Sequence, residues 1–455
     1  MLALVGAGLL AAFLWNGRNG DSAIRQQKAA GSADVPRATS AGVPQDPSAG
    51  VPRATSVAPP GNGMPTIEIE ALRVVSTPGA ADIVAGSLTE KIRDAFARFA
   101  TINVVSAPQP GDSGAAASTR ADYRLSGSVQ YGATTTRALF RLLDVSDGII
   151  AWTQAFEYPN VATDRGAPED EIVVSVADAL LQFYGVIYAR DRARQLASRA
   201  GDPRYRCVLD ATEYIRSYEP AAYDRVRSCL EQLTAIDPSF AIGFELLAFL
   251  YVRESNLNLP AHVGDPPALD RALRAARHAI ELNPASARAY LALFVVLYSR
   301  RDVAAAFAAG DKALALNRYD LITVAEYGGR LIMTGEVERG MRMLKRAGDA
   351  GSIRPTLHDF YLFLGNYLQG DMKEAAFHAA QITADNFPYG LVARAIADNR
   401  AGNVEQARMA IERLVEVQPS WRNDARGELA KQILKPEIVD SLLRDLAAAG
   451  LAGAP

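Results

Sequence analysis

The stretch Gly335-Glu336-Val337-Glu338-Arg339-Gly340 decides the fold, because its pattern recurs along the second half of the chain. Four turns of this kind begin 34, 35 and 32 residues apart: Arg301-Asp302-Val303, Gly335-Glu336-Val337, Gly370-Asp371-Met372 and Gly402-Asn403-Val404. A small residue lies five positions after each start: Ala306, Gly340, Ala375 and Ala407. The units end near Pro238, Pro284, Arg318, Pro355, Pro388 and Pro419. This period predicts stacked helix pairs, since a single pair cannot bury its own apolar face.

A period near 34, a small residue where two helices touch and Pro after the second helix resemble the tetratricopeptide repeat. We therefore expect an all-α solenoid over residues 201–455. The repeat that begins at Ala241 carries an insertion of about twelve residues, around Asn256 to Pro267. The final stretch KPEIVDSLLRDLAAAGL, from Lys435 to Leu451, is predicted to be a capping helix.

The region upstream reads as a small α/β domain over residues 65–160. Alternating or apolar runs predict strands, and these runs are Ile67–Val75, Ile102–Val105, Tyr123–Tyr131, Arg137–Val145 and Ile149–Phe156. Asp147-Gly148 is a strong hairpin turn signal between the last two strands. Ser87 and Glu90 match a capping box, which predicts a helix that begins at Ser87.

Three segments of this region follow the order of a TolB amino-terminal-like domain: GSLTEKIRDAFARFATINVVS, ADYRLSGSVQ and RALFRLLDVSDGIIAWTQAFEY. The resemblance rests on Gly127-Ser128-Val129 and on Asp144, Gly148 and Trp152. In that family the domain is non-catalytic. It resembles the module that follows the transmembrane helix in bacterial membrane-anchored adenylate cyclases and CadC-like transcriptional regulators. The resemblance therefore implies a position just beyond a membrane span.

The amino-terminal end carries an unbroken apolar run of 14 residues, Leu2 to Trp15. As a helix it would be about 21 Å long, short of the roughly 30 Å hydrocarbon core. We expect a membrane anchor at residues 1–20, although a cleaved signal peptide and a core helix stay open. Residues 21–64 are rich in Pro, Ala and Ser and repeat Val-Pro-Arg-Ala-Thr-Ser, which predicts a disordered linker.

Cys207 and Cys229, the chain's two cysteines, lie in a predicted helical hairpin whose turn is Tyr218-Glu219-Pro220. Each is about eleven residues from Tyr218, so antiparallel helices would bring them level with each other. A disulfide is within reach, although two buried thiols remain the alternative. If the bond forms, this half lies in an oxidising compartment, which for a bacterium means the periplasm.

Little in the chain points to catalysis or to a cofactor. Its four histidines, His262, His278, His358 and His378, lack metal-ligand spacing, and no phosphate-binding loop or nucleophile elbow occurs. A net charge of -3 argues against nucleic acid as a ligand. We therefore predict no enzyme activity, no cofactor and no bound metal, and we infer no small-molecule substrate.

Binding is the expected activity, because the first helices of tetratricopeptide repeats line a concave groove. Carrying those positions over gives five aromatic candidates for contact with a protein or peptide partner: Phe249, Tyr298, Phe360, Tyr367 and Tyr389. Their alternative role is packing in the core. The inserted loop with His262 and Asp265 is a second candidate contact.

In all, the sequence predicts an α+β protein. A membrane helix at 1–20 and a linker at 21–64 precede the α/β domain at 65–160, a connecting helix at 161–200 and the solenoid at 201–455. We expect a single-pass inner-membrane protein, mostly periplasmic, that binds a protein or peptide partner. The alternative is that the chain is the sensory half of a membrane-anchored nucleotide cyclase or winged-helix regulator. The start of the membrane span and the output domain would then lie upstream of this chain.

Overall fold

The computed structural model describes residues 63–75, 79–106, 121–160, 166–198, 201–350 and 356–451. The described residues all belong to one compact unit, which spans residues 54–455. The anchor predicted at residues 1–20 lies outside the described residues, as does the linker up to residue 62.

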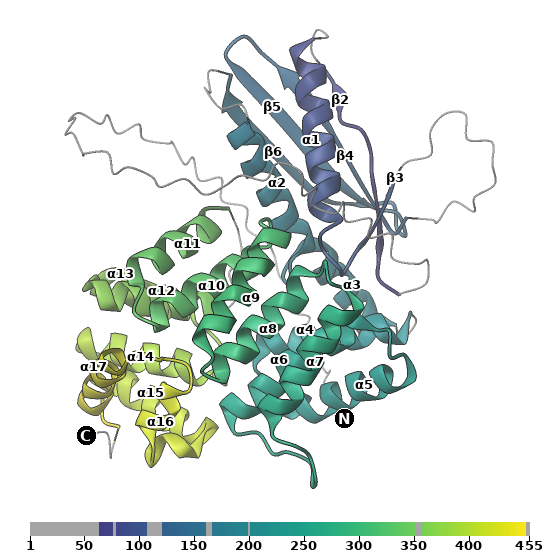
Figure 1. Ribbon diagram of the computed structural model, residues 1–455. Helices are drawn as coiled ribbons and strands as arrows, with labels where there is room; N and C mark the ends of the chain where they lie inside the picture. The colour runs from purple at the N-terminus through teal and green to yellow at the C-terminus, as the bar shows by residue number, and fades with distance from the viewer. Residues whose placement is uncertain are drawn as a thin grey trace, which may run out of the picture. The chain divides into compact units, whose positions relative to one another are not determined.

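A mixed sheet forms the first part of the described chain (Figure 1). Its strands are β1 Thr66–Ile69, β2 Arg73–Val74, β3 Asn103–Ser106, β4 Tyr123–Tyr131, β5 Thr135–Asp144 and β6 Ile150–Pro159. The order is β3-β1-β4-β5-β6, with β2 also paired to β4. The pairs of β1 with β3 and β4 are parallel, and β4, β5 and β6 form an antiparallel meander.

Alternation along the strands decides which face of the sheet is covered. Every second side chain of β5 is buried, from Thr136 to Asp144, and the intervening ones are half-buried or exposed. Helix α1, Ala80–Phe96, packs on the buried face against β4, and helix α2, Gly166–Leu181, packs against α1. The predicted strand Ile67–Val75 is divided into β1 and β2. Between them the Leu72 amide donates to the Thr89 hydroxyl of α1 instead of to a neighbouring strand.

The predicted helix start at Ser87 is wrong, since α1 begins seven residues earlier at Ala80. Gly79 precedes the helix, and its amide donates to the Asp82 carboxylate at 2.7 Å, which supplies the local cap. Ser87 lies about two turns inside the helix, where its hydroxyl donates to the Glu169 carboxylate of α2 at 2.6 Å. The Ser-Leu-Thr-Glu pattern therefore marks a contact between helices instead of a helix end.

The connecting segment at 161–200, which the sequence predicts to be one helix, is also divided. Its two helices are α2, Gly166–Leu181, and α3, Val186–Ala197. The stretch Pro168–Ala197 is the one part of the described chain that is helical, long and apolar enough to cross a membrane. Yet 61% of its most apolar window is buried inside the protein, as in a helix of a protein core.

Helix pairs fill the rest of the described chain (Figure 1). They are α4 Pro203–Ser217 with α5 Tyr223–Ile236, α6 Ala241–Leu257 with α7 Ala268–Leu282, α8 Ala287–Ser299 with α9 Val303–Leu316, α10 Leu321–Met333 with α11 Val337–Ala350, α12 Thr356–Gln369 with α13 Met372–Gln381, and α14 Pro388–Arg400 with α15 Val404–Val417. Two further helices follow, α16 Ala425–Ala430 and α17 Pro436–Ala448. The helical repeat predicted from the turns is therefore present, and α17 occupies the predicted capping position.

Backbone geometry explains why the repeat was visible in the sequence. Gly335, Gly370 and Gly402 have φ values of 96, 80 and 81°, which glycine adopts without steric cost. Five residues on, a Cβ at Gly340 would lie 2.4 Å from the Gly328 carbonyl oxygen. The small position is therefore required by the close approach of α10 and α11.

The first helix pair is cross-linked. Cys207 of α4 and Cys229 of α5 form a disulfide, with their Cα atoms 6.0 Å apart. The two helices face each other at these positions, so the cysteines lie level with each other, as their equal spacing from Tyr218 predicts.

The last helices contact the first ones and close the inner side of the repeat. Asn258, at the end of α6, donates to Ser420 at 3.2 Å and to Glu428 of α16 at 3.0 Å. At the other side the rings of Tyr218 and Phe387 lie 4.5 Å apart, centre to centre. These residues are more than 160 positions apart in the chain, so the repeat curls until its ends meet.

Candidate functional site

Inside this closed curl lies a cavity of about 160 Å³. Its walls come from α4, α6, α8, α10, α12 and α14, the first helices of six successive pairs, and from Phe387 and Gln432. Phe183 and Tyr184, between α2 and α3, complete the lining. The cavity is therefore bounded by the repeat and by the segment that leads into it from the sheet.

Aromatic rings form much of the wall. The ring of Phe360 lies 5.2 Å from that of Tyr389 and 6.1 Å from that of Phe387. Burial raises the pKa of Tyr361 and of Tyr389 well above the usual value, so both phenols stay protonated. The hydroxyl of Tyr389 donates to the Glu428 carbonyl at 2.8 Å, which orients its ring beside the cavity.

Four arginines and one glutamate supply the charge of the lining. Arg330 pairs with Glu326 and donates to the Tyr361 hydroxyl at 2.9 Å. Arg288 pairs with Asp320, a carboxylate outside the lining, and Arg216 pairs with Glu213 at 2.6 Å. Arg253 is the fourth arginine, and it stands apart from the other three.

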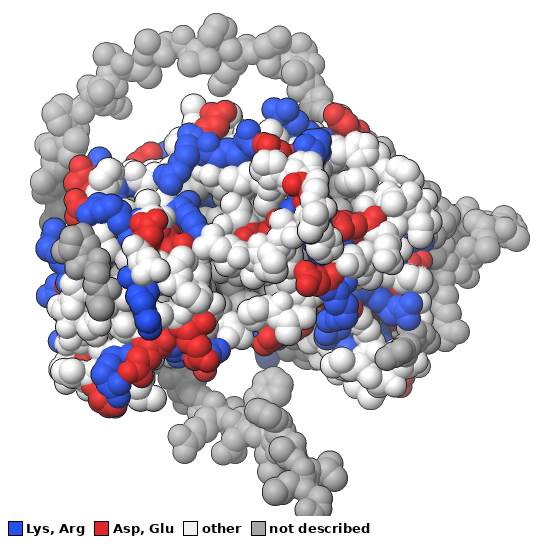
Figure 2. Space-filling model, turned by 90° about the horizontal axis from the view of Figure 1, so that it is seen from below, with Lys and Arg blue, Asp and Glu red and all other residues white. Residues whose placement is uncertain are grey.

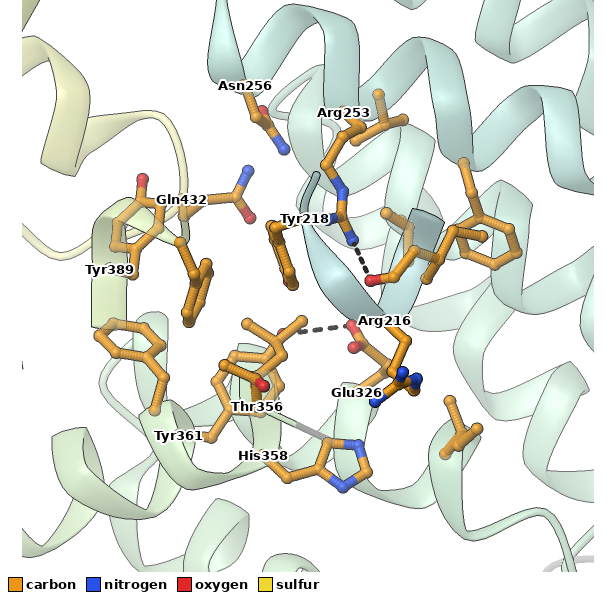
Figure 3. A pocket seen from close by; sticks show the side chains of 18 of the residues that line it. Arg216, Tyr218, Arg253, Asn256, Glu326, Thr356, His358, Tyr361, Tyr389 and Gln432 are labelled. Atoms are coloured by element: carbon orange, nitrogen blue, oxygen red, sulfur yellow. Dashed lines mark hydrogen bonds between the residues drawn. The ribbon is translucent and has the colours of Figure 1, made fainter. Parts of the chain in front are cut away.

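Among the described residues no carboxylate lies within ion-pair distance of Arg253. Its guanidinium lies over the ring of Tyr218, 3.7 Å from the ring centre, and its Nη2 donates to the Ile215 carbonyl at 3.2 Å. Its Nη1 is buried without a hydrogen-bond partner. Figure 3 shows Arg253 and Tyr218 on one side of the cavity, with Gln432 and Tyr389 on another.

The structure divides the five aromatic candidates from the sequence. Phe249, Phe360 and Tyr389 line the cavity. Tyr298 is fully buried outside the lining, and its hydroxyl donates to the Gln432 carbonyl at 2.8 Å. Tyr367 donates to Asp445 of α17 at 2.7 Å. The last two therefore hold the carboxyl-terminal segment on the repeat.

The second candidate contact, the inserted loop, is tied down from within. The Asp265 carboxylate accepts from Arg227 of α5 at 2.5 Å and from the backbone amide of His262 at 3.0 Å. Pairing with Arg227 holds the pKa of Asp265 below its usual value. Asp265 thus anchors the loop, and the His262 side chain is exposed.

Sequence reasoning missed Arg253, Tyr218 and Gln432. Tyr218 was read as a turn residue, and the structure gives it a φ of 58° at the end of α4. Arg253 looked like an ordinary helix-surface residue, and Gln432 lies in a segment without a repeat pattern. Their meeting depends on the closure of the repeat, for which the local sequence holds no signal.

Neither a metal site in the described part of the chain nor a patch of one charge on the face drawn in Figure 2 stands out. Among the described residues no cluster of three or more His, Cys, Asp or Glu side chains could hold a metal ion. On the face drawn in Figure 2, basic and acidic side chains are interspersed with uncharged surface.

Comparisons with known proteins found similarities to solved structures alone. No family model and no curated protein matches the chain. Solved structures with similar folds include a human IFIT1 dimer with PPP-AAAA, at 17% identity and a TM-score of 0.40, over 63% of this chain and 66% of that one. PilW, a type IV pilus biogenesis factor, matches at 21% identity and 0.32, over 50% of this chain and 95% of its own.

YrrB, a TPR protein with an unusual peptide-binding site, matches at 18% identity and a TM-score of 0.28, over 39% of this chain and 92% of that one. At these scores the similarities carry no argument about this chain, and what those proteins bind does not transfer to it.

Proposed function

We propose that this chain is a non-catalytic, membrane-tethered interaction or sensing protein that recognises a protein or peptide partner through the inner side of its repeat. The observation that carries the proposal is the cavity, because inner helices of six successive pairs and three of the aromatic candidates converge on it. Such concave sites with a few polar groups are the usual places for recognition.

Tethering rests on the sequence. The apolar run Leu2–Trp15 would be the anchor, and the resemblance of residues 65–160 to a TolB amino-terminal-like domain supports a place beyond a membrane span. The Cys207–Cys229 disulfide supports a periplasmic location, since such bonds persist in oxidising compartments.

A second candidate function is the sensory half of a longer signalling protein. Phe183 and Tyr184 favour it, because they line the cavity and lie at the break between α2 and α3. An occupant of the cavity would touch the segment that leads to the sheet, which is what a sensor requires. Reading the genomic DNA upstream of the Met1 codon in frame discriminates this candidate: a cyclase or winged-helix domain there supports it.

Photo-crosslinking in isolated membranes tests the first proposal. A benzophenone side chain replaces Phe249, which lines the cavity, or Arg274, an exposed residue of the outer helix α7. We expect a specific protein adduct from position 249 and none from position 274. Absence of any adduct at 249, or the same adducts at both positions, would contradict recognition by the inner side.

A further inference from the structure

The cavity carries a positive charge that the protein itself does not neutralise. Three of its four arginines have carboxylate partners, and Arg253 has none within reach among the described residues. Arg253 as a whole is half-buried, but its Nη1 is buried without a hydrogen-bond partner, and a bound anion would supply one. The charge of the lining therefore favours an anionic ligand group.

The unpartnered hydrogen-bonding groups of the lining also favour a ligand with acceptor oxygens. Three buried nitrogens of the lining lack partners: Arg253 Nη1, Arg330 Nε and Gln432 Nε2. Gln432 is only 8% exposed, and its side chain borders the cavity in Figure 3. All three groups are donors, so a matching ligand brings acceptor oxygens.

The rest of the wall calls for an apolar body of limited size. Rings of Tyr218, Phe360, Phe387 and Tyr389 face the space, together with aliphatic side chains such as Ile215 and Val295. The volume of about 160 Å³ is close to that of a cavity of roughly 150 Å³ that holds a benzene ring. One ring-sized group with a short substituent fits this space.

Closure of the repeat favours a free molecule over a continuous peptide. The Tyr218–Phe387 ring contact closes one side, and Asn386 adds a hydrogen bond to Glu219 at 3.3 Å. The bonds of Asn258 to Ser420 and Glu428 close another. An extended chain running through the repeat would have to break these contacts, so a protein partner can reach the cavity only with a chain end or a single side chain.

We propose that the cavity is a binding site for a small free carboxylate with a ring-sized apolar body, whose carboxylate pairs with Arg253. This inference goes beyond the proposed function, because the ligand is a small molecule and not the protein partner. The carboxylate would accept hydrogen bonds from Arg253 Nη1 and from the Gln432 amide, and the ring would pack among Tyr218, Phe387 and Tyr389. Charge-assisted pairing in an apolar cavity is what distinguishes the acid from its neutral amide.

Titration of the full chain with phenylacetate and with the isosteric phenylacetamide tests the assignment, by calorimetry or ligand-observed NMR. We expect the acid to bind at least tenfold more tightly than the amide. Arg253→Gln should remove that preference and leave amide binding in place, which also shows that the cavity is still formed. Arg253→Lys should retain part of the preference, and Arg408→Gln, at an exposed position on α15, should change nothing.

Equal affinities for acid and amide, or no binding of either, overturn the assignment. So does a preference that survives in Arg253→Gln. Tight binding of a peptide such as acetyl-Ala-Ala-Phe through its free carboxyl end, without binding of phenylacetate, would overturn the small-molecule assignment in favour of a chain end. The crosslinking result from position 249 is a separate measurement, so failure here and failure of the proposed partner recognition are distinguishable.

Discussion

Reduction of the Cys207–Cys229 disulfide should loosen one helix pair and leave the distant ones unchanged. The bond closes a loop with a sequence separation of 22. For a loop of this length the lost chain entropy of the opened state corresponds to about 3 kcal/mol. In a repeat array each pair contacts mainly its neighbours, so the effect stays local to α4 and α5.

Native-state hydrogen exchange measures this effect directly. A change of about 3 kcal/mol raises the population of the opened α4–α5 pair roughly a hundredfold. Backbone amides of α4 and α5 should therefore exchange about a hundredfold faster in protein reduced with a phosphine than in oxidised protein. Amides of α9 and α11 are the internal control and should keep their rates. Exchange of α4 and α5 within a factor of two in both forms would refute the reasoning.

Three further predictions concern single residues. Burial raises the pKa of Glu245 to about 7 from 4.5, so the folded state binds the proton more tightly, and the free energy of unfolding should fall by about 3 kcal/mol as pH rises from about 4.5 to 7. Urea unfolding at pH 5 and pH 8 measures this pH dependence, which Glu245→Gln should remove and the exposed control Glu437→Gln should leave in place. Gly340→Ala should destabilise the folded protein by about 1–3 kcal/mol, because the new Cβ meets the Gly328 carbonyl, whereas Gly86→Ala in α1 has open space and should stabilise the protein slightly. Thermal melts that rank the two variants the other way would contradict this. Ser87→Ala should cost about 1 kcal/mol by removing the hydrogen bond to Glu169, and an unchanged urea midpoint would count against that contact.

The repeat was predictable because its signals are local. Gly335, Gly370 and Gly402 sit where the backbone needs positive φ, and Gly340 sits where two helices nearly touch. Even Arg301, with a φ of 68°, was found, because the Asp302-Val303 that follows kept the pattern. Hairpin and strand signals around Asp147-Gly148 worked for the same reason.

The start of α1 and the break before α3 were not predictable from the same rules. A capping-box pattern at Ser87 is satisfied by a tertiary partner, Glu169, which only the packing of α2 on α1 supplies. At Gly185 a Cβ would lie 2.8 Å from the Leu180 carbonyl, so that glycine permits a tight turn between the apolar helix α2 and the charged helix α3. Periodicity alone reads those helices as one.

The candidate site was half predictable. Phe249, Phe360 and Tyr389 follow from the rule that first helices line the inner side, and they do line the cavity. The closure that turns this side into a cavity arises from the summed rotation of all repeats. Arg253 therefore acquires its place over Tyr218 only in the folded chain.

The most direct test of the account is native mass spectrometry of protein freshly isolated from its own cells. If the cavity is the ligand site, part of the wild-type protein carries a small non-covalent mass that acid extraction identifies as an apolar carboxylic acid, and Arg253→Gln protein lacks it. Wild-type protein at its bare mass, or the same adduct on wild type and Arg253→Gln alike, would contradict the central claim.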